Sequence, residues 1–143
     1  MSGIVRYNTT MLPKNSAIHQ TYHTDAPIEK VWDALVNPKT IESWGGGPAR
    51  MSNKLESFSL WDGEIHGRNT EVVEGKKLVQ EWYAWDESLG ASTVTFTITV
   101  DGKETVIDLS HSNVPESEYE EVEVGWKNYY MEPILEWIEN DDH

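Results

Sequence analysis

The sequence predicts an α+β domain in which a curved antiparallel sheet of about six or seven strands wraps around one long C-terminal helix, with two short helices after the first strand. Two patterns lead to this fold class. Between residues 55 and 111, runs of strand formers are separated by turns, and the Asp-Gly pairs at 62–63 and 101–102 are strong hairpin signals. Further along the chain, apolar residues recur at helical spacing. The 143 residues suit one domain, which at this size can bury about two-thirds of the surface that its unfolded chain exposes.

The first expected elements are a strand and two short helices. Residues 16–24 are rich in strand formers and follow a segment, 1–15, with no sustained period, which we expect to be a loose N-terminal extension. Pro27 fits the first turn of a helix that runs to about residue 36, because the apolar residues after it recur at spacings of three and four. A second short helix, 39–44, leads into the glycine-rich loop 45–48.

The central part of the chain is expected to form a meander of antiparallel strands. The predicted strands are 56–61, 64–73, 77–85, 92–100 and 104–111. Turn residues separate them at 62–63, 74–75, 88–90 and 101–102. Within 92–100, apolar residues alternate with threonines, which defines one apolar face and one face that can be exposed to water.

The long C-terminal helix is expected over 116–139, followed by a short tail, 140–143. The apolar residues that form its stripe are Tyr119, Val122, Trp126, Tyr129, Pro133 and Trp137. We expect Trp126, near the middle of this stripe, to insert between helix and sheet and to be mostly buried. Pro133 removes one helical hydrogen bond, so the helix either kinks there or bends around the sheet.

Composition and charge exclude several classes of partner. The chain has 25 acidic and 11 basic residues, and the resulting net charge of −14 repels nucleic acid and anionic lipid surfaces. No stretch approaches the ~20 apolar residues of a membrane span, so we expect no membrane insertion. There is no cysteine, which suits a cytoplasmic protein. The seven tryptophans indicate a large aromatic core or the wall of a cavity.

The residues that could carry chemistry give no complete catalytic or metal-binding pattern. His19 and His23 would lie about 13 Å apart on a strand, too far to share one ion, so we expect no metal. No cofactor fingerprint is present. His111, His66 and Arg68 are the candidates for acid–base or anion-stabilising roles, although His111 also fits a core histidine with a hydrogen-bond partner. The sequence does not fix the strand register, which determines whether His66 and Arg68 line the cavity or face solvent.

Several ordered motifs resemble a known family. The segment APIEKVWDAL at 26–35, followed by Pro38 and Trp44, resembles the entry segment of the START-like (SRPBCC) superfamily, which includes the birch-pollen allergen. The branch that the chain resembles more narrowly is the C-terminal domain of the activator of the ninety-kilodalton heat-shock chaperone ATPase. This second resemblance rests on the motifs GEIHG at 63–67, KLVQEW at 77–82, LSHSNVP at 109–115 and GWKNYYMEP at 125–133.

The resemblance covers residues 16–139 and implies a helix-grip fold with a cavity between the sheet and the long helix. It does not extend to the separate N-terminal domain of the two-domain co-chaperones, which contributes most of their stimulation. Tyr83 departs from the pattern, since many relatives have arginine at this position, which puts any contact made by that cation in doubt.

Three functions follow as hypotheses. The first is binding of a small hydrophobic or amphipathic molecule in the cavity, the second is binding of a heat-shock chaperone, and the third, ranked last, is a cavity enzyme of polyketide-cyclase type. The candidate cavity residues are Trp32, Trp44, Phe58, Leu60, His66, Arg68, Leu78, Gln80, Trp82, Phe96, Ile98, Ile107, Leu109, His111, Val122, Trp126, Tyr129, Tyr130 and Pro133.

Overall fold

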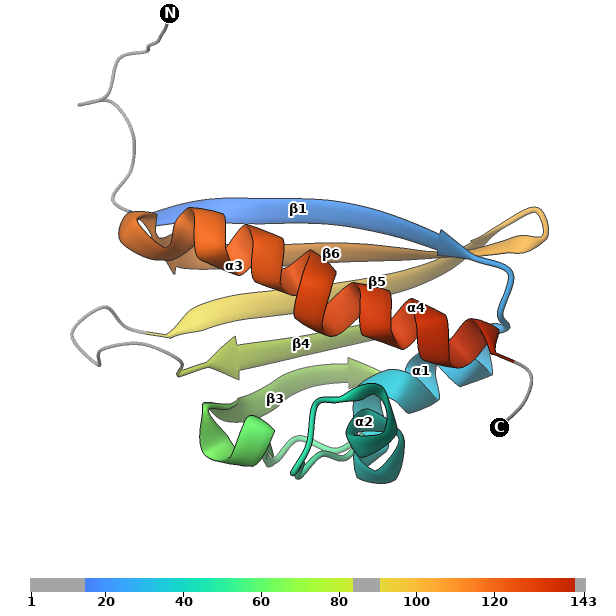
Figure 1. Cartoon of the computed structure of the whole chain (residues 1–143), viewed down its shortest axis with the longest axis horizontal. Coiled ribbons are helices and arrows are strands. Elements are labelled where there is room, and N and C mark those ends of the chain that lie inside the picture. The colour runs from blue at the N-terminus through green and yellow to red at the C-terminus, as the bar shows by residue number, and fades with distance from the viewer. Residues whose placement is uncertain (1–14, 84–90, 141–143) are drawn as a thin grey trace, which may run out of the picture.

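A computed structural model describes residues 15–83 and 91–140, which form one sheet covered on one face by a long helical segment (Figure 1). The six strands are β1 (Asn15–Thr24), β2 (Ser57–Leu60), β3 (Ile65–Val73), β4 (Lys77–Trp82), β5 (Ser92–Asp101) and β6 (Glu104–Pro115). All neighbouring pairs are antiparallel, in the order β1-β6-β5-β4-β3-β2. This arrangement confirms the expected α+β helix-grip fold.

The helices also follow the expected order. They are α1 (Ile28–Val36), α2 (Pro38–Trp44), the one-turn η2 (Trp61–Gly63) and η4 (Glu116–Glu118), and then α3 (Tyr119–Gly125), η5 (Trp126–Met131) and α4 (Glu132–Glu139). The last three run end to end as one helical segment. Residues 1–14 of the expected extension, 141–143 of the expected tail, Trp85 and the turn at 88–90 lie outside the described residues.

Strand β6 is longer than the sequence predicted. We expected it to end near His111, but it continues to Pro115. The reason is that β1 offers a partner for the extra residues, since Asn15 pairs with Pro115 in an antiparallel ladder. Asn113 accommodates the irregular register with a φ of 61°, a left-handed conformation that asparagine tolerates better than most residues.

The long helical segment changes its period at its centre. Residues Trp126–Met131 form a π-helical turn, which adds about one residue per turn and rotates the buried face. The buried side chains are therefore Trp126, Tyr130, Met131, Ile134 and Ile138. The expected stripe is correct at Trp126 but wrong at Tyr129, whose side chain is 70% exposed. Pro133 lies in the first turn of α4, directly after the π-helical turn. A proline is tolerated at such a position because it lacks a backbone N–H.

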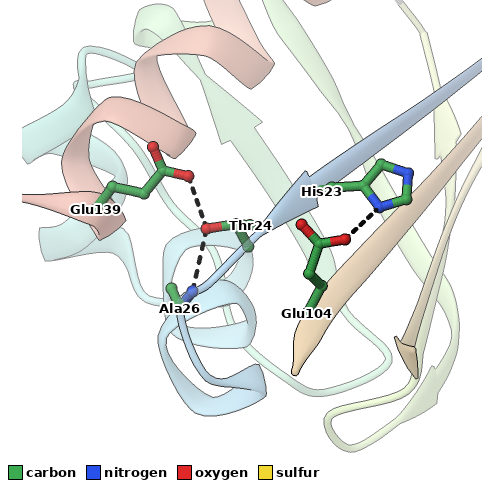
Figure 2. Close-up of polar contacts among 5 residues, drawn as sticks. All are labelled: His23, Thr24, Ala26, Glu104 and Glu139. Atoms are coloured by element: carbon green, nitrogen blue, oxygen red, sulfur yellow. Dashed lines mark hydrogen bonds and ion pairs between the residues drawn. The ribbon is translucent and has the colours of Figure 1, made fainter. Parts of the chain in front are cut away.

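Polar contacts fix the C-terminal end of this segment to the end of β1 (Figure 2). Thr24 Oγ1 donates to Glu139 Oε2 at 2.8 Å and accepts from the backbone N–H of Ala26 at 3.2 Å. On the exposed side, His23 Nδ1 lies 3.4 Å from Glu104 Oε1, a surface pair of small energetic weight. The helix is thus held at one end by a buried threonine.

Within residues 15–83 and 91–140, no group of three or more histidines or carboxylates is placed to hold a metal ion. In the same part of the chain, no helix is long and apolar enough to cross a membrane.

Candidate functional site

Aromatic side chains fill the space between the sheet and the helix. Trp82 of β4 packs against Trp126 with ring centroids 4.9 Å apart, and Trp126 packs against Tyr130 at 4.6 Å. Phe96 of β5 meets Trp126 edge to face, with ring centroids 5.7 Å apart. These four residues are at most 4% exposed. Much of the region where the resemblance implies a cavity is therefore occupied by rings.

A buried histidine anchors this cluster to the sheet. Trp126 Nε1 donates to His111 Nδ1 at 2.9 Å, and His111 Nε2 lies 2.8 Å from Ser92 Oγ. Because Nδ1 accepts a hydrogen bond, the proton of the neutral ring lies on Nε2, which donates to Ser92. Burial lowers the pKa of His111 from 6.5 to about 4. His111 is therefore neutral at pH 7, and both of its ring nitrogens form hydrogen bonds. This agrees with the alternative prediction of a core histidine with a hydrogen-bond partner.

A second polar chain runs under the cluster and joins it to the loop before β2. Trp82 Nε1 donates to Gln80 Oε1 at 2.9 Å, and Gln80 Nε2 donates to Asn69 Oδ1 at 3.0 Å. Asn69 Nδ2 then donates to the backbone carbonyls of Ser52 and Lys54 at 3.0 and 2.9 Å. Asn69 was not among the candidates predicted from the sequence, although it shares a strand face with Gly67 and Ile65, which could have indicated an inward side chain.

An open groove of about 450 Å³ lies beside the aromatic cluster, between the helical segment and the start of β3. Its lining residues are Trp61, Glu64, Ile65, Trp82, Val122, Gly125, Trp126, Tyr129 and Tyr130. The sequence analysis named five of these, Trp82, Val122, Trp126, Tyr129 and Tyr130, as cavity candidates and missed Trp61, Glu64, Ile65 and Gly125. The two walls of the groove come from segments about sixty residues apart in the sequence.

An unusual turn places Trp61 in the groove wall. Trp61 and Asp62 have φ values of 48° and 57°, a left-handed conformation that costs non-glycine residues energy. Trp61 is held there by the loop after α2, since its Nε1 donates to the carbonyl of Gly45 at 2.8 Å and its backbone N–H to Gly46 at 2.9 Å. The ring meets Tyr130 edge to face, with centroids 5.9 Å apart.

The hydroxyl of Tyr130 is buried and has no hydrogen-bond partner within the described residues. Burial raises the pKa of Tyr130, so the hydroxyl stays protonated. Leaving such a group unpaired costs about 1–3 kcal/mol. Trp32 Nε1 is in the same condition, beside a separate groove between α1 and the β3–β4 turn.

The other candidate residues divide into buried and exposed groups. Most lie on inward faces, namely Trp32, Trp44, Phe58, Leu60, Leu78, Gln80, Ile98, Ile107 and Leu109. Val122 and Pro133 are half-buried. His66 and Arg68 are exposed on the outer face of β3, so the structure does not bring them to the interior with His111. The expected face shared with Val72 is broken by a register shift between Asn69 and Glu71.

Comparison with protein families identifies the lineage of this fold. Residues 25–136 match the family described as Activator of Hsp90 ATPase homolog 1-like protein. The chain belongs to this family. The match extends from the residues before α1 into α4, so it includes the strands and helices that line the groove.

Several proteins resemble this chain in sequence or in structure. The Activator of 90 kDa heat shock protein ATPase homolog of Dictyostelium discoideum is 33% identical over 72% of this chain, which spans 28% of that relative's length. The crystal structure of an HSP90 activator from Plasmodium falciparum is 28% identical, with a TM-score of 0.74 over 83% of this chain and 93% of that one. CalU16 of Micromonospora echinospora is 26% identical, with a TM-score of 0.71 over 85% of this chain and 75% of that one.

Proposed function

We propose that this protein binds a small apolar or amphipathic molecule in the groove beside the aromatic cluster. The observation that carries the proposal is the groove itself, about 450 Å³ in volume and walled by Trp61, Trp82, Trp126 and Tyr130. Small-molecule sites are typically concave, about 300–1,000 Å³ in volume, and lined by apolar and aromatic side chains with few polar groups. Among the lining residues, Glu64 and the exposed Tyr129 carry such polar groups.

Binding fits the groove better than catalysis does. His111, the best acid–base candidate of the sequence, has both ring nitrogens engaged and a pKa lowered to about 4 by burial. His66 and Arg68 lie on the outer face of the sheet. A general acid or base has to lie within hydrogen-bond reach of the reacting group, and none of these three lines the groove.

Fluorescence titration with the neutral probe N-phenyl-1-naphthylamine tests the proposal. We expect saturable enhancement in the wild-type protein. Ile65→Glu, which places a charge in the groove wall, should weaken probe binding by roughly tenfold or more. Val100→Glu is the matched control, because Val100 is 60% exposed and does not line the groove. Absence of saturable binding, or equal affinities of the two variants, would overturn the proposal; circular dichroism verifies that both variants fold.

A second candidate function is binding to a heat-shock chaperone of the Hsp90 class. It is supported by the family match and by the likeness to the HSP90 activator of Plasmodium falciparum, 93% of which aligns with this chain. Calorimetric titration against the cognate chaperone should give saturable binding that weakens as salt rises, because the chain carries a net charge of −14. No heat of binding at micromolar concentrations would remove this candidate and would leave the groove proposal unaffected.

A further inference from the structure

The groove has a distinctive charge pattern for an apolar site. Among the residues that the structure describes, Glu64 is the only ionised side chain in its lining, which otherwise consists of aromatic, aliphatic and glycine residues. No lysine, arginine or histidine of residues 15–83 and 91–140 lines it. The net charge of the whole chain is also negative, since it has 25 acidic residues and 11 basic ones. The electrostatic potential in the groove therefore favours a cation and opposes an anion.

The aromatic walls act in the same direction. The face of an aromatic ring is electron-rich, so organic cations bind well where several rings surround them. In this groove Trp61 and Tyr130 meet at an interplanar angle of 70°, whereas Trp126 and Tyr130 meet at 48°. Tyr129 adds a fifth ring at the exposed rim, where it is 70% exposed. Trp82, Trp126 and Tyr130 are at most 4% exposed and pack against one another, so the rings accessible to an occupant are the half-buried Trp61 and the exposed Tyr129.

We propose that the groove selects amphipathic organic cations, that is, quaternary or protonated alkylamines whose apolar chain packs on the aromatic cluster. The ammonium group lies near Glu64 and the ring faces of Trp61 and Tyr129, and the chain lies along Ile65 and Val122. This inference rests on the proposed function, because it specifies the ligand class of the same groove.

Three probes with the same chain and different head groups separate this inference from the proposed function. They are hexyltrimethylammonium, 1-hexanol and hexanesulfonate, each used to displace N-phenyl-1-naphthylamine at low ionic strength. We expect the cation to bind about tenfold more tightly than the alcohol, and the sulfonate to bind most weakly. Equal affinities for cation and alcohol would overturn the cation inference and leave the proposed function standing. If no probe binds, both fail.

Variants assign the selectivity to named residues. Glu64→Gln should weaken hexyltrimethylammonium binding about threefold to fivefold and leave 1-hexanol binding unchanged. Glu116→Gln removes the same charge at an exposed residue outside the groove and is the matched control. Trp61→Leu keeps an apolar wall but removes the ring, so it should reduce the preference for the cation over the alcohol. If Glu64→Gln and Trp61→Leu both leave this preference unchanged, the assignment is wrong.

Discussion

Trp126 joins the helical segment to the sheet, and its replacement tests the packing of the interior. Its side chain is 3% exposed and contacts the rings of Trp82, Phe96, His111 and Tyr130. Its indole N–H donates to His111 Nδ1 at 2.9 Å. The Trp126→Ala variant therefore loses a large buried ring and leaves a buried acceptor without its donor.

The expected loss of stability follows from these two contributions. Deleting a buried tryptophan or phenylalanine side chain typically costs about 3–5 kcal/mol. A buried acceptor left unpaired costs about 1–3 kcal/mol. We expect Trp126→Ala to lower the free energy of unfolding by about 4–8 kcal/mol, which is comparable with the whole stability of many domains of this size. Trp126→Phe keeps most of the packing and should cost about 1–3 kcal/mol.

Urea unfolding followed by far-ultraviolet circular dichroism measures both effects. Tyr129→Ala is the matched control, because this aromatic residue is three positions away on the same helical segment and is 70% exposed. It should change the free energy of unfolding by no more than about 0.5 kcal/mol. The reasoning is refuted if Trp126→Ala costs less than about 1 kcal/mol, or no more than Tyr129→Ala. Should Trp126→Ala fail to fold, the comparison of Trp126→Phe with Tyr129→Ala decides the question.

Further predictions concern the buried polar groups and one close backbone contact. Because burial lowers the pKa of His111 from 6.5 to about 4, the unfolded chain binds this proton more tightly, and stability should fall as the pH drops through that interval. The difference in unfolding free energy between wild type and His111→Asn should shrink by about 2 kcal/mol from pH 7 to about pH 5, whereas a constant difference would contradict the assigned pKa. Gly67→Ala should abolish or severely weaken folding, measured as soluble yield and melting temperature, since its Cβ would lie 1.7 Å from the carbonyl oxygen of Glu81. Asn69→Ala should cost about 1–3 kcal/mol in urea unfolding, because Gln80 loses its oxygen acceptor and the carbonyls of Ser52 and Lys54 lose a side-chain donor; a loss below about 0.5 kcal/mol would show that the polar chain is not stabilising.

Patterns of period two and strong turn signals predicted most of the fold. The alternation along β5 and the Asp-Gly turns fixed the strands because each depends on neighbouring residues alone. The inward position of Trp82 followed in the same way, because Trp82 shares a strand face with Leu78, and both are buried. Local spacing also placed Trp126 correctly, since it is the first residue of the π-helical turn and the change of period affects the residues after it.

Features that depend on distant contacts were beyond these patterns. The π-helical turn buries Met131, five residues after Trp126, and leaves Tyr129 exposed, which a helical period of 3.6 residues does not predict. The outward position of His66 depends on how β3 pairs with β4, and the register shift between Asn69 and Glu71 separates its face from that of Val72. Trp61 reached the groove through a left-handed turn held by Gly45, which lies sixteen residues earlier. The sequence could therefore indicate the aromatic interior and most of the helical wall of the groove, but not the wall formed by Trp61, Glu64 and Ile65.

The indole N–H resonances of the tryptophans report directly on whether the groove beside the aromatic cluster is the ligand site. In a ¹H–¹⁵N spectrum titrated with N-phenyl-1-naphthylamine, we predict progressive shifts of the indole signals of Trp61, Trp82 and Trp126, which line the groove. The signals of Trp32 and Trp137, which do not line it, should stay in place. Shifts confined to Trp32 would place the ligand in the separate groove beside α1, and an unchanged spectrum at saturating probe would contradict the proposed ligand site altogether.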